Sequence, residues 1–584
     1  MKIPEFFKSK IKITTVIVVC LLIGFIVVPI ICSDNFYMQI RKYQDVYSYF
    51  VREYFEDVDM QKMTEDAIRG MIKGLEDPHS AYISAKDMTS VNEEMSGSFE
   101  GIGIEFMILY DTLTVNVPIK GGPCDLLGVM PGDKIVEVNG NSIVGIEQDS
   151  IPKLLKGPKG TVVKIGIVRS GNKGLLEFIV TRDRISKYSV DAFLILEGTD
   201  IGLIKVNRFA QTTHREMIEA SKKLKSQGMK KLILDLRGNG GGILDQAFLI
   251  ADEFLKGGDT IVYTKGRTPE SFQTFIANSG QGLEDIPLIV LIDGGSASAS
   301  EIVSGAVQDL DRGLIVGLTS FGKGLVQRQF PIFDGSAIRV TTSRYYTPSG
   351  RCIQRPFNDK EAWRKLTDRL ELEEGANLEH TLDKIKKEES LTAASKDNKS
   401  KDVKKKKGDT TDKSINLDSI EIFRTRSGRP VLGGGGVTPD YVIRYDNRKL
   451  SEFTISMWGK GIFREFVNNH WKEIKEKYGD NFSKFNAEFV LDESMIKDLQ
   501  KLTENKEIEW KNEDFENDLN IITVRLIKSQ IARVVWDNNA EVQVLNDMDR
   551  QLKKAMELFP LAEKIQTSSK NTNTTNNKNN NKKK

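Results

Sequence analysis

Three short apolar runs in the middle of the chain constrain its fold more than any other feature. They are residues 231–236 (KLILDL), 288–292 (LIVLI) and 314–316 (LIV). Segments with helical apolar periodicity lie between or beside them, at residues 212–226, 243–256 and 298–309. Continuous apolar runs are typical of strands buried on both faces, and such strands alternate with helices in α/β folds. We therefore expect an α/β core in which helices cover a mixed sheet.

The segments on either side of this core have different patterns. In residues 98–182, short β-branched runs such as 162–168 alternate with glycine-rich turns such as 139–141, which predicts a small β-rich module. Residues 35–95 carry apolar side chains at three- and four-residue spacing and are expected to be helical, as are most of residues 450–565.

The N-terminal segment predicts a membrane anchor. Residues 1–12 carry four lysines, and residues 13–32 form an apolar run. A run of about 20 residues is long enough to cross a hydrocarbon core, and the preceding lysines favour a cytoplasmic N-terminus. A cleaved signal segment is the alternative, although no A-x-A site follows. We expect residues 13–32 to hold the rest of the chain at a bacterial-type inner membrane, on its periplasmic or extracytoplasmic side.

Two polar segments are expected to lack a packed core. Residues 358–415 form a charged, lysine-rich insertion, and residues 567–584 are nearly all Asn, Lys, Ser and Thr. Such compositions bury too little apolar surface to fold, so we interpret the first as a flexible insertion and the second as a disordered tail.

Composition disfavours several classes of function. The 84 basic residues are balanced by 82 acidic ones, which gives no reason to expect nucleic-acid binding, because phosphate recognition needs a concentrated basic face. The four cysteines form no C-x-x-C pair, and the four histidines form no H-E-x-x-H motif. We therefore expect no metal, no cofactor and no metalloprotease chemistry.

A serine-rich segment follows the second apolar run and opens a helix. Residues 293–303 read DGGSASASEIV, with serines at 296, 298 and 300. A serine at a helix start lies beside unpaired N–H groups that suit a developing oxyanion. Serine is also a common helix cap, but three alternating serines cannot all serve as caps. One of them is therefore a candidate nucleophile.

The candidate base is Lys323, in the segment 320–324 (SFGKG). A crossover through helix 298–309 and strand 314–318 can return the chain beside the strand that precedes the serines. Lowering a lysine pKa from about 10.4 to about 7–8 costs roughly 3–5 kcal/mol, which burial can supply. Phe321, Leu325 and Val326 are the available apolar neighbours. Residues 317–324 do not form a phosphate-binding loop, since glycine follows the lysine.

Eight ordered motifs between about residues 60 and 445 resemble the carboxy-terminal processing, or tail-specific, proteases. They are DPHSAY (77–82), GSFEGIGIEF (97–106), VMPGDKIVEVNG (129–140), LILDLRGNGGGIL (232–244), GSASASEIVSGAVQD (295–309), SFGKGLVQ (320–327), YYTPSGRCIQ (345–354) and GGGGVTPD (433–440). The resemblance implies a serine protease core over residues 183–357 and 416–447.

By this resemblance, Ser298 is the nucleophile, Lys323 the general base and Gln327 the residue that orients the lysine. Gln327 is the least secure, because four residues of extended strand span about 13 Å, and only a bend at the neighbouring glycines brings it close. The oxyanion donors are expected to be the amide of Ala299 and one from residues 240–242, for which we take Gly241 and Gly242.

Residues 98–182 resemble a PDZ domain, in which Gly101, Ile102, Gly103 and Ile104 match the carboxylate-binding loop. The expected partners are proteins with accessible C-terminal tails, gripped by strand addition, and a homo-oligomer is compatible with the sequence. One alternative is a non-catalytic PDZ adaptor on a protease-like core. Another is a Ser-His hydrolase.

Overall fold

The computed structural model describes residues 34–278, 280, 282–356, 374–375, 378, 383, 421–446 and 448–568 of the 584-residue chain. The segments 1–12 and 13–32 lie outside the described residues, as do nearly all of the insertion 358–415 and all but the first two residues of the tail 567–584. Within the described ranges, no helix combines the length and the apolar character that a membrane span requires.

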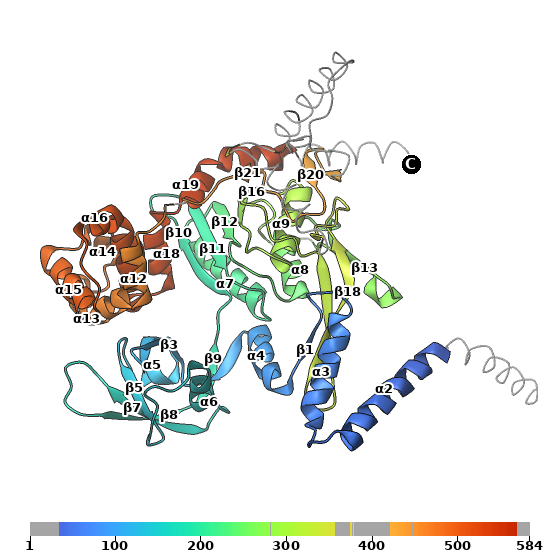
Figure 1. Cartoon of the computed structure of the whole chain (residues 1–584). Coiled ribbons are helices and arrows are strands. Elements are labelled where there is room, and N and C mark those ends of the chain that lie inside the picture. Colours follow the sequence, from blue (N-terminus) through green and yellow to red (C-terminus); the bar gives the residue numbers. More distant parts are fainter. Residues whose placement is uncertain are drawn as a thin grey trace, which may run out of the picture.

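The N-terminal region is helical, as predicted. Its elements are α2 (Asp34–Glu53), α3 (Met60–Lys73), β1 (Ala81–Ile83) and α4 (Ala85–Ser96). Asp59 caps α3 by accepting the amide of Lys62, and Ser84 caps α4 by accepting the amide of Asp87. Helix α2 extends away from the rest of the chain, and its large apolar side chains, Phe36 and Tyr37 among them, are exposed (Figure 1).

The β module is a six-stranded antiparallel sheet with short helical segments. Its sheet has the order β3 (Ile104–Leu109), β4 (Thr112–Pro118), β5 (Lys134–Val138), β7 (Val162–Val168) and β8 (Leu176–Thr181), with β6 (Asn141–Ser142) beside β5. Its helices are α5 (Pro123–Leu126), η1 (Gln148–Ser150) and α6 (Ile151–Leu155). On β7, Val163, Ile165 and Ile167 are fully buried at alternate positions, as a one-sided sheet requires. The two-stranded ladder of β2 (Ser98–Gly101) and β9 (Asp183–Ser186) joins this module to the core.

The predicted apolar runs form neighbouring strands of one sheet. Its order is β10 (Val190–Ile195), β11 (Ile201–Val206), β12 (Lys231–Asp235), β15 (Leu288–Ile292), β16 (Leu314–Gly317) and β21 (Tyr441–Val442). Only β10 is antiparallel, which makes the sheet mixed. One face packs against α7 (Thr213–Ser226), α8 (Leu244–Asp252) and α9 (Ala299–Asp309). The α/β core is thereby confirmed.

A second sheet packs beside the α/β core. It has the order β1, β18 (Ala337–Tyr346), β13 (Thr260–Gly266) and β14 (Gln273–Ile276), with β17 (Leu325–Pro331) also pairing with β18. The short helix η2 (Pro269–Ser271) joins β13 and β14, and β19 (Ile422–Arg424) forms a hairpin with β20 (Pro430–Leu432). Because β18 pairs with both β1 and β17, it brings the N-terminal region against the segment that follows Lys323.

The C-terminal residues form a helical module with its own core, which contains Phe463, Phe466 and Phe485. Its elements are α12 (Glu452–Gly459), α13 (Ile462–Tyr478), α14 (Phe482–Glu488), α15 (Glu493–Glu504), α16 (Asn512–Asn520), η4 (Ile521–Lys528), α17 (Ser529–Val535), α18 (Asn538–Asn546) and α19 (Arg550–Glu557), followed by helical residues 559–568. We call residues 451–568 the C-terminal helical module. It lies beside both the β module and the α/β core (Figure 1).

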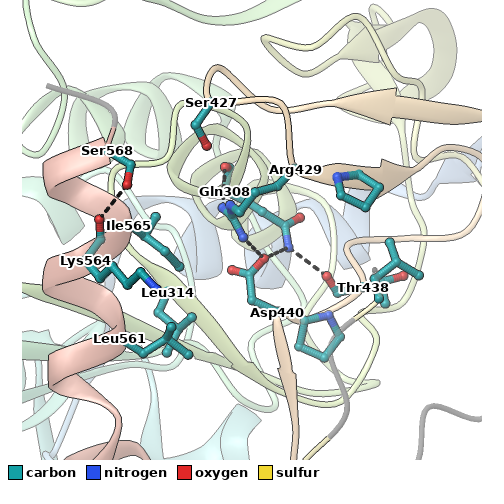
Figure 2. A pocket seen from close by; sticks show the side chains of 13 residues that line it. Gln308, Leu314, Ser427, Arg429, Thr438, Asp440, Leu561, Lys564, Ile565 and Ser568 are labelled. Carbon is teal, nitrogen blue, oxygen red and sulfur yellow. Dashed lines mark hydrogen bonds and ion pairs between the residues drawn. The ribbon is translucent and has the colours of Figure 1, made fainter. Parts of the chain in front are cut away.

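A cavity of about 370 Å³ lies between helical residues 561–568, the start of β16 and the segment 427–440 (Figure 2). Its polar side chains bond to one another. Arg429 Nη1 lies 2.5 Å from Asp440 Oδ1, and Gln308 Nε2 donates to that oxygen at 2.9 Å and to the carbonyl of Thr438 at 2.8 Å. This network joins the segment 427–440 to α9 and requires no ligand.

Candidate active site

Three neighbouring parallel strands deliver the predicted site residues to one edge of the sheet. The glycine-rich loop 237–242 follows β12, the serine loop 293–298 follows β15, and the segment containing Lys323 follows β16. β15 pairs with both of the others, and the predicted return of the chain beside it is confirmed. Carboxyl ends of parallel strands are the usual place for a site in an open α/β sheet.

Ser298 has the strained backbone of a sharp strand-to-helix turn. Its φ is 55° and its ψ is −108°, a region that non-glycine residues rarely occupy. Such a conformation costs about 1–3 kcal/mol and persists only where the surroundings enforce it. Strain of this kind projects a nucleophilic serine from the turn in other hydrolases. The side chain is half-buried, whereas Ala297 and Ala299 on either side are buried.

The other two serines of the segment hold loops together. Ser296 Oγ donates to the carbonyl of Leu236 at 2.8 Å, and Ser300 Oγ donates to the carbonyl of Asn239 at 2.9 Å. Asp293 Oδ1 also accepts the amide of Gly238 at 2.9 Å. The serine loop and the glycine loop therefore form one bonded unit, in which the hydroxyls of Ser296 and Ser300 are already committed.

The buried carboxylate of Glu301 ties Ser298 to Lys323. Its Oε2 accepts the amide of Ser298 at 2.8 Å and the amide of Lys323 at 2.9 Å. Its Oε1 accepts the hydroxyl of Ser320 at 2.5 Å and the amide of Gly322 at 2.7 Å. Burial raises the pKa of Glu301, and these four hydrogen bonds oppose that rise by favouring the carboxylate. Because one oxygen accepts from both amides, the two backbones cannot separate without losing a buried bond.

Tyr345, on β18, supports the same two residues from the other side. Its hydroxyl lies 3.1 Å from the carbonyl oxygen of Ser298 and 2.7 Å from that of Lys323. Burial raises the pKa of Tyr345, so the phenol stays protonated and able to donate. Sequence reasoning assigned no role to either Tyr345 or Glu301.

The surroundings of Lys323 destabilise its charged ammonium form relative to the neutral amine. Burial lowers the pKa of Lys323, and the positive charge of Arg339 lowers it further, while Asp77 and Glu301 act in the opposite direction. Of the expected apolar neighbours, Leu325 is buried but Phe321 is 46% exposed, so Phe321 contributes little to this desolvation. The side chains of Ser298 and Lys323 are not hydrogen-bonded to each other in this structure.

The DPHSAY segment lies beside Lys323, a proximity that sequence reasoning did not predict. Ser80 Oγ donates to Asp77 Oδ2 at 2.6 Å, and the amide of Thr341 on β18 donates to Ser80 Oγ at 3.1 Å. Burial, followed by the positive charge of Lys323, lowers the pKa of His79. His79 is therefore close enough to the candidate base for the charge of Lys323 to affect its protonation.

Gln327 lies at an irregularity of β17. The register with β18 shifts between Val326 and Gln327, and a bulge of this kind redirects a side chain. Lys323 precedes the strand, which begins at Leu325, so the distance expected for a straight strand does not apply. The Gln327 Nε2 is buried without a hydrogen-bond acceptor among the described residues, which leaves it available to an incoming group.

Gly241 and Gly242 differ in what their amides do. The amide of Gly241 donates to Asn239 Oδ1 at 2.9 Å, so in this conformation it is engaged. The amide of Gly242 has no acceptor within the described chain, and Gly242 is the better candidate for the second oxyanion donor. A Cβ on Gly241 would lie 2.9 Å from the Cβ of Ser298 and 3.0 Å from the amide nitrogen of Ala299, so no side chain fits there.

The loop 101–104 opens onto the free edge of β3, the edge strand of the β module. The carbonyl oxygens of Ile102 and Gly103 accept amides of the same module at 3.1 and 2.9 Å, whereas their own amides have no acceptor within the described residues. Gly103 adopts a φ of 74°. The side chains of Ile102 and Ile104 pack into the module core, so they support the loop from beneath.

The described residues contain no group of three or more His, Cys, Asp or Glu side chains arranged to hold a metal ion. His214 is paired with Glu253 at 2.8 Å, and His470 lies 3.3 Å from Asp498, both outside this site. Burial raises the pKa of the Cys124 thiol to about 12, which leaves it unreactive in the β module core.

Comparison with known proteins follows the same division of the chain. Residues 200–358 match Peptidase family S41, residues 114–169 match the PDZ domain, and residues 32–87 match the N-terminal domain of the activating protease CtpB. Residues 453–537 match a family of unknown function, DUF8443, within the C-terminal helical module.

Similar proteins carry related names. A carboxy-terminal-processing protease of Bartonella bacilliformis is 39% identical over 326 residues, which is 55% of this chain and 74% of that protein. A probable CtpA-like serine protease of Staphylococcus epidermidis is 35% identical over 318 residues, 54% of this chain and 63% of that protein. The structure of a photosystem II D1 C-terminal processing protease is 29% identical over 53% of this chain and 82% of its own, with a TM-score of 0.31.

Proposed function

The chain belongs to the carboxy-terminal processing protease family, and we propose that it is a serine endopeptidase in which Ser298 is the nucleophile and Lys323 the general base. The observation that carries this proposal is the shared bonding of the two residues. Glu301 accepts both of their amides, and Tyr345 lies within hydrogen-bonding distance of both of their carbonyls. Burial and Arg339 favour the neutral lysine that a base requires.

In this mechanism, Ser298 Oγ attacks the scissile carbonyl carbon and passes its proton to Lys323 Nζ. The amides of Ala299 and Gly242 stabilise the oxyanion at the start of α9. The lysine then protonates the leaving amine as the C–N bond breaks, and water hydrolyses the acyl-enzyme by the same path in reverse. Gln327 is assigned the role of orienting the lysine, with its side-chain amide oxygen accepting an N–H of Lys323.

The PDZ domain is proposed to select substrates by their C-terminal tails. The free amides of Ile102 and Gly103 and the unpaired edge of β3 support capture of a carboxylate followed by strand addition. Since the Ser298 and Lys323 side chains are not bonded to each other here, we infer that tail binding favours an arrangement in which they are.

We propose further that residues 13–32 anchor the chain, with the protease on the extracytoplasmic side. We also propose that the exposed apolar face of α2 supports a homo-oligomer. Light scattering of the purified protein, with and without residues 34–53, tests the second point. An unchanged monomer mass in both samples would contradict it.

The proposed activity is tested by incubating an unfolded protein substrate with the wild type or with Ser298→Ala. New C-termini, mapped by mass spectrometry, are expected only with the wild type. The adaptor alternative predicts tail binding without cleavage by either protein. Glu301, Tyr345 and the strained Ser298 together favour the enzyme, because a site that had lost its chemistry has no need of that strain.

A further inference from the structure

Arg237 is the first residue of the glycine loop, and all five of its guanidinium hydrogens are paired. Two go to Asp235, from Nε at 2.9 Å and from Nη2 at 2.7 Å. The other three go to the C-terminal helical module. Asp549 accepts from Nη1 at 3.0 Å and from Nη2 at 2.6 Å, and Gln551 Oε1 accepts from Nη1 at 3.0 Å. A planar guanidinium saturated in this way has one allowed position.

The module is itself fixed to the α/β core at this point. Asp549 caps α19 by accepting the amide of Leu552 at 2.9 Å, and Gln551 Nε2 donates to the carbonyl of Ile443 at 2.7 Å. Leu552 and Ala555 are buried against the face of the core sheet opposite α9. Asp549 is therefore presented from a rigid helix start rather than from a mobile surface.

The loop that begins at Arg237 is in contact with the serine loop that carries the candidate nucleophile. Gly238 is held by Asp293, and Asn239 accepts the hydroxyl of Ser300 through its carbonyl. Gly241 lies so close to Ser298 that a Cβ on it would be 2.9 Å from the Ser298 Cβ. A displacement of Arg237 would shift the loop on which Gly242 presents its amide. Oxyanion donors must lie at 2.7–3.1 Å from the developing charge, so such a shift is costly.

We propose that Asp549 and Gln551 are positioning residues for the oxyanion loop, so that the C-terminal helical module is part of the catalytic unit. The inference rests on the proposed function for its kinetic consequences, but its structural consequence does not depend on activity. Asp549 and Gln551 follow the part of the module, residues 453–537, that matches a family of unknown function.

The decisive variant is Asp549→Ser. Serine retains the helix cap but is too short to reach Arg237, so the helix start is preserved while two of the five guanidinium bonds are lost. Glu557→Gln is the control, since it removes one carboxylate from the same helix at an exposed ion pair with Lys554. Circular dichroism and thermal unfolding verify that both variants are folded.

Three readouts are measured on the full chain. Hydrogen exchange of the amides of residues 238–242 should be faster in Asp549→Ser and unchanged in Glu557→Gln. Peptide cleavage by Asp549→Ser should show kcat lowered by about 10²-fold, with KM nearly unchanged, as expected for a misplaced catalytic group. Affinity for a peptide boronate, which forms a tetrahedral adduct on the serine, should fall with kcat.

Unchanged exchange in residues 238–242 of a folded Asp549→Ser protein would overturn the inference, whether or not the wild type cleaves peptides. Loss of ground-state peptide binding in parallel with kcat would also overturn it, because that result indicates general disruption. Absence of Ser298-dependent cleavage by the wild type, together with faster exchange in Asp549→Ser, would refute the proposed function while supporting the positioning role.

Discussion

Replacing Glu301 by Gln tests whether one buried carboxylate assembles the site. The glutamine keeps the shape of the side chain but offers one acceptor oxygen where the carboxylate offers two. Two of the four donors that now bond to Glu301 would then face an NH₂ group: either the amides of Ser298 and Lys323, or the Ser320 hydroxyl and the Gly322 amide.

The size of the effect follows from those two bonds. Hydrogen bonds to a charged group contribute about 1.5–3 kcal/mol each, so the variant loses about 3–6 kcal/mol. Burial of a neutral amide is easier than burial of a carboxylate, which places the expected loss near the lower end, about 3 kcal/mol. At about 2–4 °C per kcal/mol, the unfolding temperature of the protease core falls by about 6–12 °C. Cleavage should fall by at least about 10²-fold, since Ser298 and Lys323 are no longer held in register.

The assay is peptide cleavage at a temperature well below unfolding, with calorimetry on the same samples. Glu253→Gln is the matched control, because Glu253 is also a buried glutamate but lies outside the site, paired with His214. The control is expected to lose stability and keep its kcat. A folded Glu301→Gln protein with wild-type kcat would refute the view that this carboxylate aligns nucleophile and base.

Three further outcomes are expected. Arg339→Gln removes a positive charge that lowers the pKa of Lys323, so this pKa should rise in the variant. Because the neutral lysine forms only as pH rises through its pKa, the rate profile should move to higher pH. An unmoved profile would contradict Lys323 as the titrating base. His79→Gln should leave cleavage and its alkaline pH dependence in place, whereas loss of activity with loss of an ionisation near 6.5 would favour the Ser-His alternative. Two peptides that differ only in a free or amidated C-terminus should be cleaved with different kcat/KM, and equal values would exclude carboxylate capture by the loop 101–104.

The α/β core could be predicted because its strands are nearly pure apolar runs that end at glycine or serine loops. The crossover rule for parallel strands predicted that Ser298 and Lys323 lie on adjacent loops. The parallel pairing of β15 with β16, the strands that precede these loops, confirms this placement. Glu301 had a signal that was not used, since a serine followed three residues later by glutamate at a helix start is a capping-box pattern.

Other parts of the site had no local signal. Tyr345 and Asp77 reach the lysine through the pairing of β18 with β1 and with β17, and antiparallel pairs far apart in sequence cannot be read from periodicity. Asp549 contacts Arg237, which lies 312 positions earlier in the sequence. The local sequence around Asp549 indicates only a helix cap and gives no sign of this contact. For Gln327 the sequence suggested a bend at the neighbouring glycines, whereas the strand begins only at Leu325 and its irregularity lies between Val326 and Gln327.

The central claim is that Lys323 serves Ser298 as its general base. The most direct measurement is kcat/KM for a peptide with a free C-terminus, compared between the wild type and Lys323→Ala at several pH values, with folding verified by calorimetry. Loss of the base should lower the rate by at least the 10²–10⁴-fold typical of general-base catalysis and abolish the alkaline rise of the profile. A well-folded Lys323→Ala protein that cleaves at close to the wild-type rate would contradict the account.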